Sequence, residues 1–500
     1  MKARENASDL LFSVIAAAAF FLLLRATPDI PGGDDAYRHV KFAYRLIHDP
    51  HDALLYPWKL MYFWPKPVDA WFGYHLLLAP LTLVLGLITA AKTLASLVYG
   101  AQTLALLSIL KQAGVFWRRA WVLLAMLGSG MALWRAALSR PFLFSIVLVL
   151  AATYFTMREN RLAVGLVSAA HALSYSMFFM VAFAPLMHFA LRRSQAALKV
   201  LAASAAGLSF GLLLNPTLPE NVRFDVTQAL APLTFGSRLI MEHLPLSWEI
   251  VNPARPLLGV WLVALLRVAW LWRNQRFSSL SQSARLLLAM SVVCFTASLA
   301  IGRIFDYFIP LGALASAAIL TPWILETRRN RRDAAAAAIL LALLCGSNLL
   351  GAYQAVKKAP PAQRFQGVSQ FLLANARGAI VFNTQWEQYP FLYFWNSQST
   401  YLVGIDPSFM LHQVPHRYWL WRHIANDQPS TCGVPTCNGS GIREIGKVVS
   451  EDFGAAFVIV EHDRNPRLDQ ILQGSPEFHE VYRDSFCSLF GTVARQALRH

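Results

Sequence analysis

The sequence predicts an α-helical polytopic membrane protein that carries a small α/β domain at its carboxyl end. Hydrophobic residues make up 56% of the 500 residues and charged residues only 14%, a balance that is not typical of water-soluble domains. Long apolar runs fill the chain up to about residue 354, whereas short β-branched and aromatic runs alternate with polar connectors after it. We therefore expect a transmembrane domain, 1–354, with an external loop, 27–70, and an outer α/β domain, 355–500.

Roughly 11 apolar runs are long enough for a bilayer core of about 30 Å, which takes about 20 helical residues. The first run follows Lys2 and Arg4, and no small-x-small cleavage site follows Leu24, so we interpret it as a retained helix rather than a signal peptide. The run 162–191 fits either one tilted helix or two short ones meeting at HALSY. The runs lie near 10–26, 71–90, 93–111, 120–137, 141–157, 162–191, 197–214, 257–272, 284–301, 307–325 and 334–354.

The net charge of +16 is concentrated in short clusters between apolar runs. This spacing is typical of cytoplasmic loops that obey the positive-inside rule, and it argues against a stripe that binds nucleic acid. The last two clusters predict that residue 355 onward lies on the periplasmic side of a bacterial inner membrane, and a first helix with its amino terminus inside puts the loop 27–70 on the same side. The clusters are RENR at 158–161, RR at 192–193, RNQR at 273–276 and RRNRR at 328–332.

The external loop contains GGDDAYRHVKFAYRLIHDP at 32–50. Its apolar and cationic residues each recur at helical spacing, which predicts an amphipathic helix on the outer membrane surface. Asp34 could cap this helix and Asp35 could offset its macrodipole. Alternatively, Asp35 and His39, at i and i+4, share a face where an external acceptor could meet a lipid-borne donor. The apolar stripe is Tyr37, Val40, Tyr44 and Ile47, and the cationic stripe is Arg38, Lys41, Arg45 and His48.

The local pattern G-D-D-A-Y-R-H resembles the G-N-D-x-x-x-H pattern of archaeal oligosaccharyltransferase catalytic subunits. These enzymes belong to the GT-C superfamily of glycosyltransferases, whose first external loop carries a catalytic aspartate, often in an acidic pair. The resemblance implies that Asp35 is the catalytic aspartate, that His39 takes the histidine position, and that Asp34 is a reserve base or an orienting partner. It extends weakly over most of the chain.

A second motif, IVFNTQWEQYP at 380–390, resembles the strand and following W-W-D-Y-G of oligosaccharyltransferases. The resemblance implies that Trp386, Glu387 and Tyr389 contact the acceptor. The acidic residue here is longer and proline replaces glycine, so recognition of an Asn-containing acceptor peptide is not carried over. Packing at the end of a strand is the alternative role for this motif.

Metal-dependent members of the superfamily bring an acidic or histidine pair from a later external loop. This chain has neither Asp nor Glu between Asp69 and Glu159, and it has Arg135 and Arg140 in MALWRAALSRP instead. Because divalent cations need anionic oxygen ligands, we expect no cofactor and expect arginines to neutralise the lipid phosphate. A site for Mn²⁺ or Mg²⁺ stays possible if a later acidic residue completes it, the candidates being Glu220, Asp225 and Glu242.

A further arginine, Arg303, lies in GRIFDYFIP, which resembles arginine-bearing segments near the last spans of several membrane glycosyltransferases. The resemblance implies that Arg303 grips the donor phosphate. Asp306, at i+3, could instead neutralise it. We expect the phosphate-binding set to include Arg303, Arg140, Arg135, Arg38 and His39.

The cysteine pattern bears on the outer domain. CGVPTC places Cys432 and Cys437 in a loop rich in Gly, Pro and Asn, where a disulfide fits an oxidising compartment. A zinc site shared with His423 is the alternative. Cys294 and Cys345 lie in apolar runs and are expected to be small buried hydrophobes.

Together these features predict transfer of a sugar from a polyprenyl-phosphate donor to an acceptor hydroxyl, with inversion and with Asp35 as the base. The expected partners are membrane lipids, the lipid-linked sugar and a glycan, lipid or protein acceptor, without nucleic acid. Two other classes stay open. A transporter or flippase of lipid-linked sugars would show repeats, and none is visible. A non-catalytic component of envelope polysaccharide assembly would use Asp34 and Asp35 only as helix caps.

Overall fold

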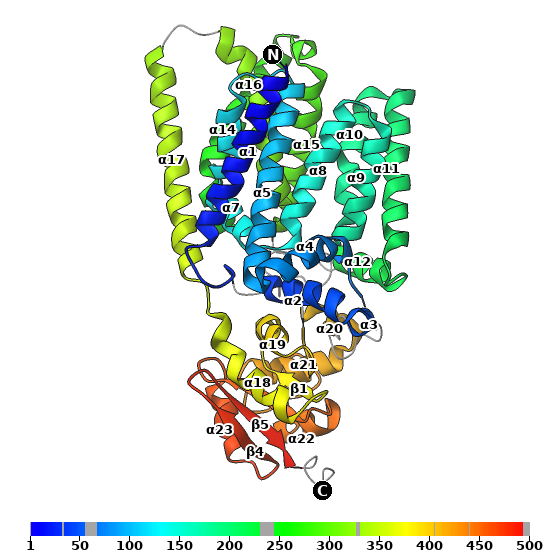
Figure 1. Ribbon diagram of the computed structural model, residues 1–500, viewed down its shortest axis with the longest axis vertical. Coiled ribbons are helices and arrows are strands. Elements are labelled where there is room, and N and C mark those ends of the chain that lie inside the picture. The colour runs from blue at the N-terminus through cyan, green and yellow to red at the C-terminus, as the bar shows by residue number, and fades with distance from the viewer. Residues whose placement is uncertain are drawn as a thin grey trace. The chain divides into compact units, whose positions relative to one another are not determined.

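The computed structural model describes residues 2–32, 35–55, 68–230, 245–326, 331–404, 406–439 and 441–493. They form two compact units, each drawn in Figure 1. Described residues up to 32, those from 70 to 229 and those from 245 to 359 make the first unit. Residues 35–55, 68, 69 and those from 360 on make the second. The division differs from the predicted domains because much of the external loop groups with the carboxyl-terminal part of the chain.

The first unit is helical, and in its described part six helical stretches are long and apolar enough to cross a membrane. A bent pair, α6 (Arg118–Leu127) and α7 (Gly130–Ala137), raises the number to seven if it counts as one span. Length alone therefore supports fewer than the roughly 11 predicted spans. The six stretches contain α1 (Lys2–Leu24), α5 (Leu87–Gln112), α11 (Gln195–Leu214), α14 (Arg255–Arg273), α16 (Phe305–Glu326) and α17 (Arg331–Lys357).

Further apolar helices of 10–17 residues account for the other predicted runs. The run 162–191 is two helices, α9 (Arg161–Ser174) and α10 (Phe183–Arg192), joined by the short helix η1 (Phe178–Ala182). The break follows HALSY, where α9 ends and Tyr175 is extended. The remaining short apolar helices are α4 (Phe72–Leu85), α8 (Pro141–Met157) and α15 (Gln282–Ser298).

Small residues bring α9 and α11 together. A Cβ atom on Gly207 would lie 2.0 Å from the carbonyl oxygen of Gly165, and one on Gly211 would lie 2.2 Å from that of Ala169. Backbones that approach this closely are typical of small-xxx-small helix pairs in membranes. Both helices begin at a side-chain cap, since Asn160 and Ser194 each accept a hydrogen bond from the backbone N–H three residues on.

The second unit contains a five-stranded sheet of order β2-β1-β3-β5-β4, which confirms a small α/β fold at the carboxyl end. β1 lies parallel to both β2 and β3, while β5 is antiparallel to β3 and β4. The central strands β1 and β3 are almost fully buried, as expected where helices cover a parallel sheet. The strands are β1 (Ile380–Asn383), β2 (Thr400–Tyr401), β3 (Phe457–Glu461), β4 (Phe478–Arg483) and β5 (Cys487–Thr492).

Helices of the second unit include α18 (Gln366–Asn375), α19 (Tyr389–Trp395), α21 (Pro415–Ala425) and α23 (Pro466–Gln473). The predicted amphipathic helix is α2 (Asp35–His48), with α3 (Pro50–Leu55) after it. α2 packs on α19, and the Tyr37 ring lies 5.0 Å from that of Phe391 and 5.1 Å from that of Phe394. We expected the apolar face of α2 to lie on the lipid surface. In the structure Tyr37 of this face packs on protein, because α19 supplies aromatic rings beside it.

Candidate functional site

The predicted catalytic aspartate is the first residue of α2. Its Oδ1 accepts a hydrogen bond of 2.6 Å from Nε of Arg38, and the side chains of Asp35 and Arg38 are 22% and 3% exposed. Among the described residues, Oδ2 of Asp35 has no bonded partner, so one carboxylate oxygen stays available for a proton. His39 is buried. The sequence placed Asp35 and His39 on one face of the helix, and the ion pair that the structure shows joins Asp35 to Arg38, at i+3. Asp34 lies outside the described residues.

A second contact of α2 involves Arg45, whose Nη1 lies 3.1 Å from the hydroxyl oxygen of Tyr393. Tyr393 stacks on Tyr389 with ring centroids 5.4 Å apart. Burial raises the pKa of both phenols, and Arg38 and Arg45 oppose that rise for Tyr389 without offsetting it. Both phenols are therefore neutral hydrogen-bonding groups at ordinary pH. Tyr389, predicted to contact the acceptor, lies inside the domain beside the cations of α2.

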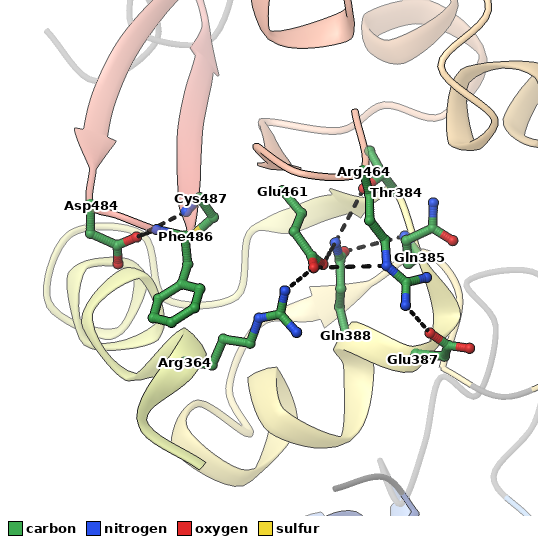
Figure 2. A network of polar contacts seen from close by, with 10 residues as sticks. All are labelled: Arg364, Thr384, Gln385, Glu387, Gln388, Glu461, Arg464, Asp484, Phe486 and Cys487. Carbon is green, nitrogen blue, oxygen red and sulfur yellow. Dashed lines mark hydrogen bonds and ion pairs between the residues drawn. The ribbon is translucent and has the colours of Figure 1, made fainter. Parts of the chain in front are cut away.

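Two residues of the WEQYP motif, Glu387 and Gln388, belong to a polar network that Figure 2 shows. Glu461, at the end of β3 and almost fully buried, accepts a hydrogen bond of 3.3 Å from Nε2 of Gln388 and pairs with Arg364. Arg464 lies 3.8 Å from Glu461 and 2.9 Å from Glu387. The network therefore ties the short helix η9 (Trp386–Gln388) to the sheet.

Within this motif the three predicted acceptor residues differ in exposure. Glu387 is half-exposed and Trp386 is partly buried, while Tyr389 is buried. Of these three residues, Glu387 is therefore the most exposed to solvent and Tyr389 the least.

The predicted phosphate-binding arginines of the first unit lie at helix ends. Arg135, in α7, forms an ion pair of 2.8 Å with Asp306 at the start of α16, and it lies over the Phe142 ring. Arg303 lies over the ring of Tyr175, 5.7 Å from its centroid. Asp306, which the sequence suggested as the partner of Arg303, is bound here to Arg135 of another helix.

Arg140 precedes α8 and is partly buried.

A buried polar chain in the same unit was not predicted from the sequence. Ser145, in α8, lies 2.7 Å from Nε2 of His171 in α9 and 2.6 Å from the hydroxyl of Tyr307 in α16. None of these three residues was given a role from the sequence. The signal that could have found them is the presence of polar residues inside strongly apolar helices, where they need hydrogen-bond partners.

Two pockets of the first unit are neighbours. An apolar groove is lined by residues of α1, α5, α6, α7 and α17, including Phe20, Leu23 and Leu133. A smaller pocket contains Asp306 and shares Tyr99 and Met126 with the groove. The two pockets therefore share part of a wall, and the smaller one contains the carboxylate that Arg135 binds.

Sites that could hold a metal ion are few in the part of the chain that the structure describes. There, the only close group of three metal-ligating side chains is His423, Cys432 and Cys437, and the two cysteines form a disulfide. Two of the carboxylates suggested as late metal ligands, Glu220 and Asp225, lie buried in α12 (Glu220–Leu230). The third, Glu242, lies outside the described residues. Cys294 and Cys345 are buried free thiols.

Known proteins resemble this chain in fold rather than in sequence. No family model matches the sequence, and no curated protein is similar to it. The crystal structure of the Archaeoglobus fulgidus oligosaccharyltransferase tethered with an acceptor peptide containing the NVT sequon superposes with a TM-score of 0.61 and 14% identity. The match covers 97% of this chain and 74% of that one. The same enzyme in complex with Zn and sulfate matches with a TM-score of 0.56 and 13% identity, over 96% and 73% of the two chains.

ArnT from Cupriavidus metallidurans, bound to undecaprenyl phosphate, matches with a TM-score of 0.54 and 13% identity over 97% of this chain and 98% of that one. ArnT and the oligosaccharyltransferase are both GT-C glycosyltransferases. The predicted resemblance to the GT-C superfamily is therefore confirmed at the level of the fold.

Proposed function

We propose that this chain is an integral membrane glycosyltransferase that moves a sugar from a polyprenyl-phosphate donor to an acceptor hydroxyl, with inversion. The observation that carries the proposal is Asp35, on the first turn of α2 and bonded to Arg38, in a chain with the GT-C fold. The similar structures support the two substrate classes, because one holds undecaprenyl phosphate and the other an acceptor peptide.

In the proposed reaction, the acceptor oxygen attacks the anomeric carbon while the bond from that carbon to the phosphate oxygen breaks. Asp35 takes the acceptor proton on Oδ2, while Arg38 holds Oδ1 and so orients the carboxylate. Asp34 is a reserve base or an orienting partner. Attack opposite the leaving group inverts the configuration.

The leaving phosphate gains negative charge, so cations assist its departure more than a general acid would. We assign this role to Arg303, Arg140 and Arg135 of the first unit, with Arg38 and His39 of the second as further candidates. The prenyl chain would lie in the apolar groove beside α1, which adjoins the pocket that contains Asp306. No metal is needed in this scheme, although Mn²⁺ or Mg²⁺ could add to the neutralisation.

The remaining assignments concern place. We propose that the second unit is a periplasmic domain at a bacterial inner membrane, and that it covers the acceptor, which Trp386, Glu387 and Tyr389 would help to hold. The periplasmic side follows from the positive clusters between the apolar helices.

The experiment that tests the proposal compares Asp35→Asn with Asp34→Asn. Asn keeps an oxygen that can accept the bond from Arg38, so Asp35→Asn should fold normally, yet it cannot take a proton. Transfer of radiolabelled sugar from a polyprenyl-phosphate donor by purified protein should fall by roughly 100-fold to 10,000-fold. Asp34→Asn should cost less, since Asn stands at that place in the similar archaeal motif.

The outcomes also separate the other functional classes. A non-catalytic component predicts that both variants support polysaccharide assembly normally. A flippase predicts that lipid-linked sugar crosses vesicle membranes without any transfer. Wild-type turnover by folded Asp35→Asn protein would remove the main support for a glycosyltransferase.

A further inference from the structure

A cluster in the second unit, His423 with Cys432 and Cys437, has no role in the proposed transfer. His423 lies in the last turn of α21, and both it and Cys432 are almost fully buried. The two sulfurs form a disulfide. Nδ1 of His423 lies 3.9 Å from Sγ of Cys432 and 3.5 Å from Sγ of Cys437.

These distances are those of ligands around one ion. Zinc–sulfur and zinc–nitrogen bonds of about 2.3 Å and 2.0 Å, at the tetrahedral angle, put a nitrogen and a sulfur ligand about 3.5 Å apart. The imidazole therefore needs little movement to share a metal with both sulfurs. Only the sulfurs must separate, which breaking the disulfide allows.

Hydrogen bonds fix the imidazole in the form that binds a metal. Nε2 of His423 lies 3.2 Å from the carbonyl oxygen of Pro435, which can only accept, so Nε2 carries the proton. Nδ1 then has a lone pair, which accepts the backbone N–H of Cys432 at 3.3 Å and which a bound metal ion would take over from that hydrogen bond. A histidine that donates its other ring N–H to a carbonyl is the usual arrangement of a metal ligand.

The loop does not depend on the disulfide alone for its position. Thr431 forms backbone hydrogen bonds with Arg443 across the base of the loop, and its hydroxyl donates to the carbonyl oxygen of Leu420 in α21 at 2.8 Å. Cys432 should therefore stay beside His423 after reduction, and the site is formed in advance.

We propose that His423, Cys432 and Cys437 form a redox-controlled binding site for a thiophilic divalent cation, Zn²⁺ above all, which replaces the disulfide when the two cysteines are reduced. A dithiol reductant supplies two electrons and two protons, becomes a disulfide itself and leaves two thiols. Binding of Zn²⁺ then releases those two protons and forms two zinc–sulfur bonds and one zinc–nitrogen bond, with the fourth position open to water. Two thiolates and an imidazole select zinc over magnesium, calcium or manganese.

The test uses the full-length purified protein, reduced with a phosphine and supplied with Zn²⁺ alone. Reduced wild-type protein should bind about one zinc ion per chain, because the three ligands surround a single ion. The oxidised protein should bind none with comparable affinity. Zinc should also protect Cys432 and Cys437 from alkylation, read by peptide mass spectrometry, and this readout needs no variant.

Variants then assign the ligands. The double variant Cys432→Ser, Cys437→Ser keeps Cys294, Cys345 and Cys487, so it measures background binding and should lose the ion. His423→Ala should weaken binding by about 10-fold or more, whereas the nearby exposed His416→Ala should not. Equal zinc binding before and after reduction, unprotected cysteines, or full affinity in His423→Ala would each overturn the site.

Discussion

Arg45 of α2 donates a hydrogen bond of 3.1 Å to the hydroxyl of Tyr393 in α19, across 348 positions of sequence. Both side chains are largely buried. The helix that begins at Asp35 is therefore anchored on the carboxyl-terminal domain, beside the rings of Phe391 and Phe394 that contact Tyr37. If Asp35 is the base, its position depends on a domain that lies far along the chain.

Removing this hydroxyl should loosen α2. Tyr393→Phe leaves a buried guanidinium group short of one partner and should lower the free energy of unfolding by about 1–3 kcal/mol. Thermal unfolding of purified protein in detergent would measure the loss. Tyr44→Phe, on the same helix, is the matched control and should change stability by less than about 0.5 kcal/mol. Because Arg45 and Tyr393 touch, Arg45→Gln and Tyr393→Phe should not be additive, and additive effects would argue against the bond.

The phosphate-binding proposal makes a second prediction. Arg303→Ala and Arg140→Ala should each slow transfer by roughly 100-fold, the usual cost of one preorganised contact to a developing charge. Arg158→Ala, an exposed arginine at the other end of α8, should leave the rate unchanged. Activity should also survive EDTA. Complete loss with chelator and rescue by manganese or magnesium would show that a metal neutralises the phosphate.

A third prediction concerns the partner of Asp306. The structure pairs Asp306 with Arg135 at 2.8 Å, whereas Arg303 lies over Tyr175. Stability changes from Asp306→Asn and Arg135→Gln should therefore be coupled by about 0.5–3 kcal/mol, as is usual for contacting residues. Those from Asp306→Asn and Arg303→Gln should be nearly additive. The opposite pattern would restore the pairing at i and i+3 that the sequence suggested.

The packing of α2 on α19 and the pairing of Asp306 with Arg135 show where prediction from sequence ends. Helical spacing located α2 correctly, because an amphipathic stripe depends only on residues three or four positions apart. The partner of that stripe comes from α19, and no local pattern carries that information. For the same reason, spacing within one segment suggested Arg303 as the partner of Asp306, whereas the structure pairs Asp306 with Arg135 of another helix. The pair of Asp35 with Arg38 is local, at i and i+3.

The α/β domain was easier to predict than the membrane spans. The strands Ile380–Asn383 and Phe457–Glu461 are short β-branched and aromatic runs of the kind that predicted this domain, since a buried parallel strand is a short continuous run. Span number is harder, because hydropathy does not register a helix break such as the one after HALSY. α9 and α10 are both apolar, but each is shorter than a bilayer requires.

Topology gives a fourth prediction. α17 ends at Lys357 and the carboxyl-terminal part of the second unit begins at 360, so a reporter fused at residue 360 samples the side on which that part lies. The positive clusters predict a periplasmic reporter: alkaline phosphatase should be active and a cytoplasm-dependent fluorescent protein dark. A fusion at residue 275 is the control and should show the reverse. A cytoplasmic signal at 360 would place both the domain and Asp35 on the wrong side for the proposed reaction.

The last prediction separates binding from structure in the WEQYP motif, and it uses the two glutamates that share Arg464. Glu461 is almost fully buried and pairs with Arg364, whereas Glu387 is half-exposed and pairs only with Arg464 among the described residues. Glu461→Gln removes the buried charge that Arg364 and Arg464 share and should destabilise the domain by about 1–3 kcal/mol. Glu387→Gln removes a surface pair and should cost less than about 1 kcal/mol.

If Glu387 contacts the acceptor, Glu387→Gln should raise the KM for the acceptor while the Tm and the KM for the lipid donor stay the same. Glu461→Gln should instead lower the Tm and the amount of active enzyme, with an unchanged acceptor KM in the fraction that remains folded. The comparison needs only thermal unfolding and initial rates at varied acceptor concentration. An unchanged acceptor KM in Glu387→Gln would assign the motif to packing at the end of β1, because its tryptophan and tyrosine are already partly or fully buried.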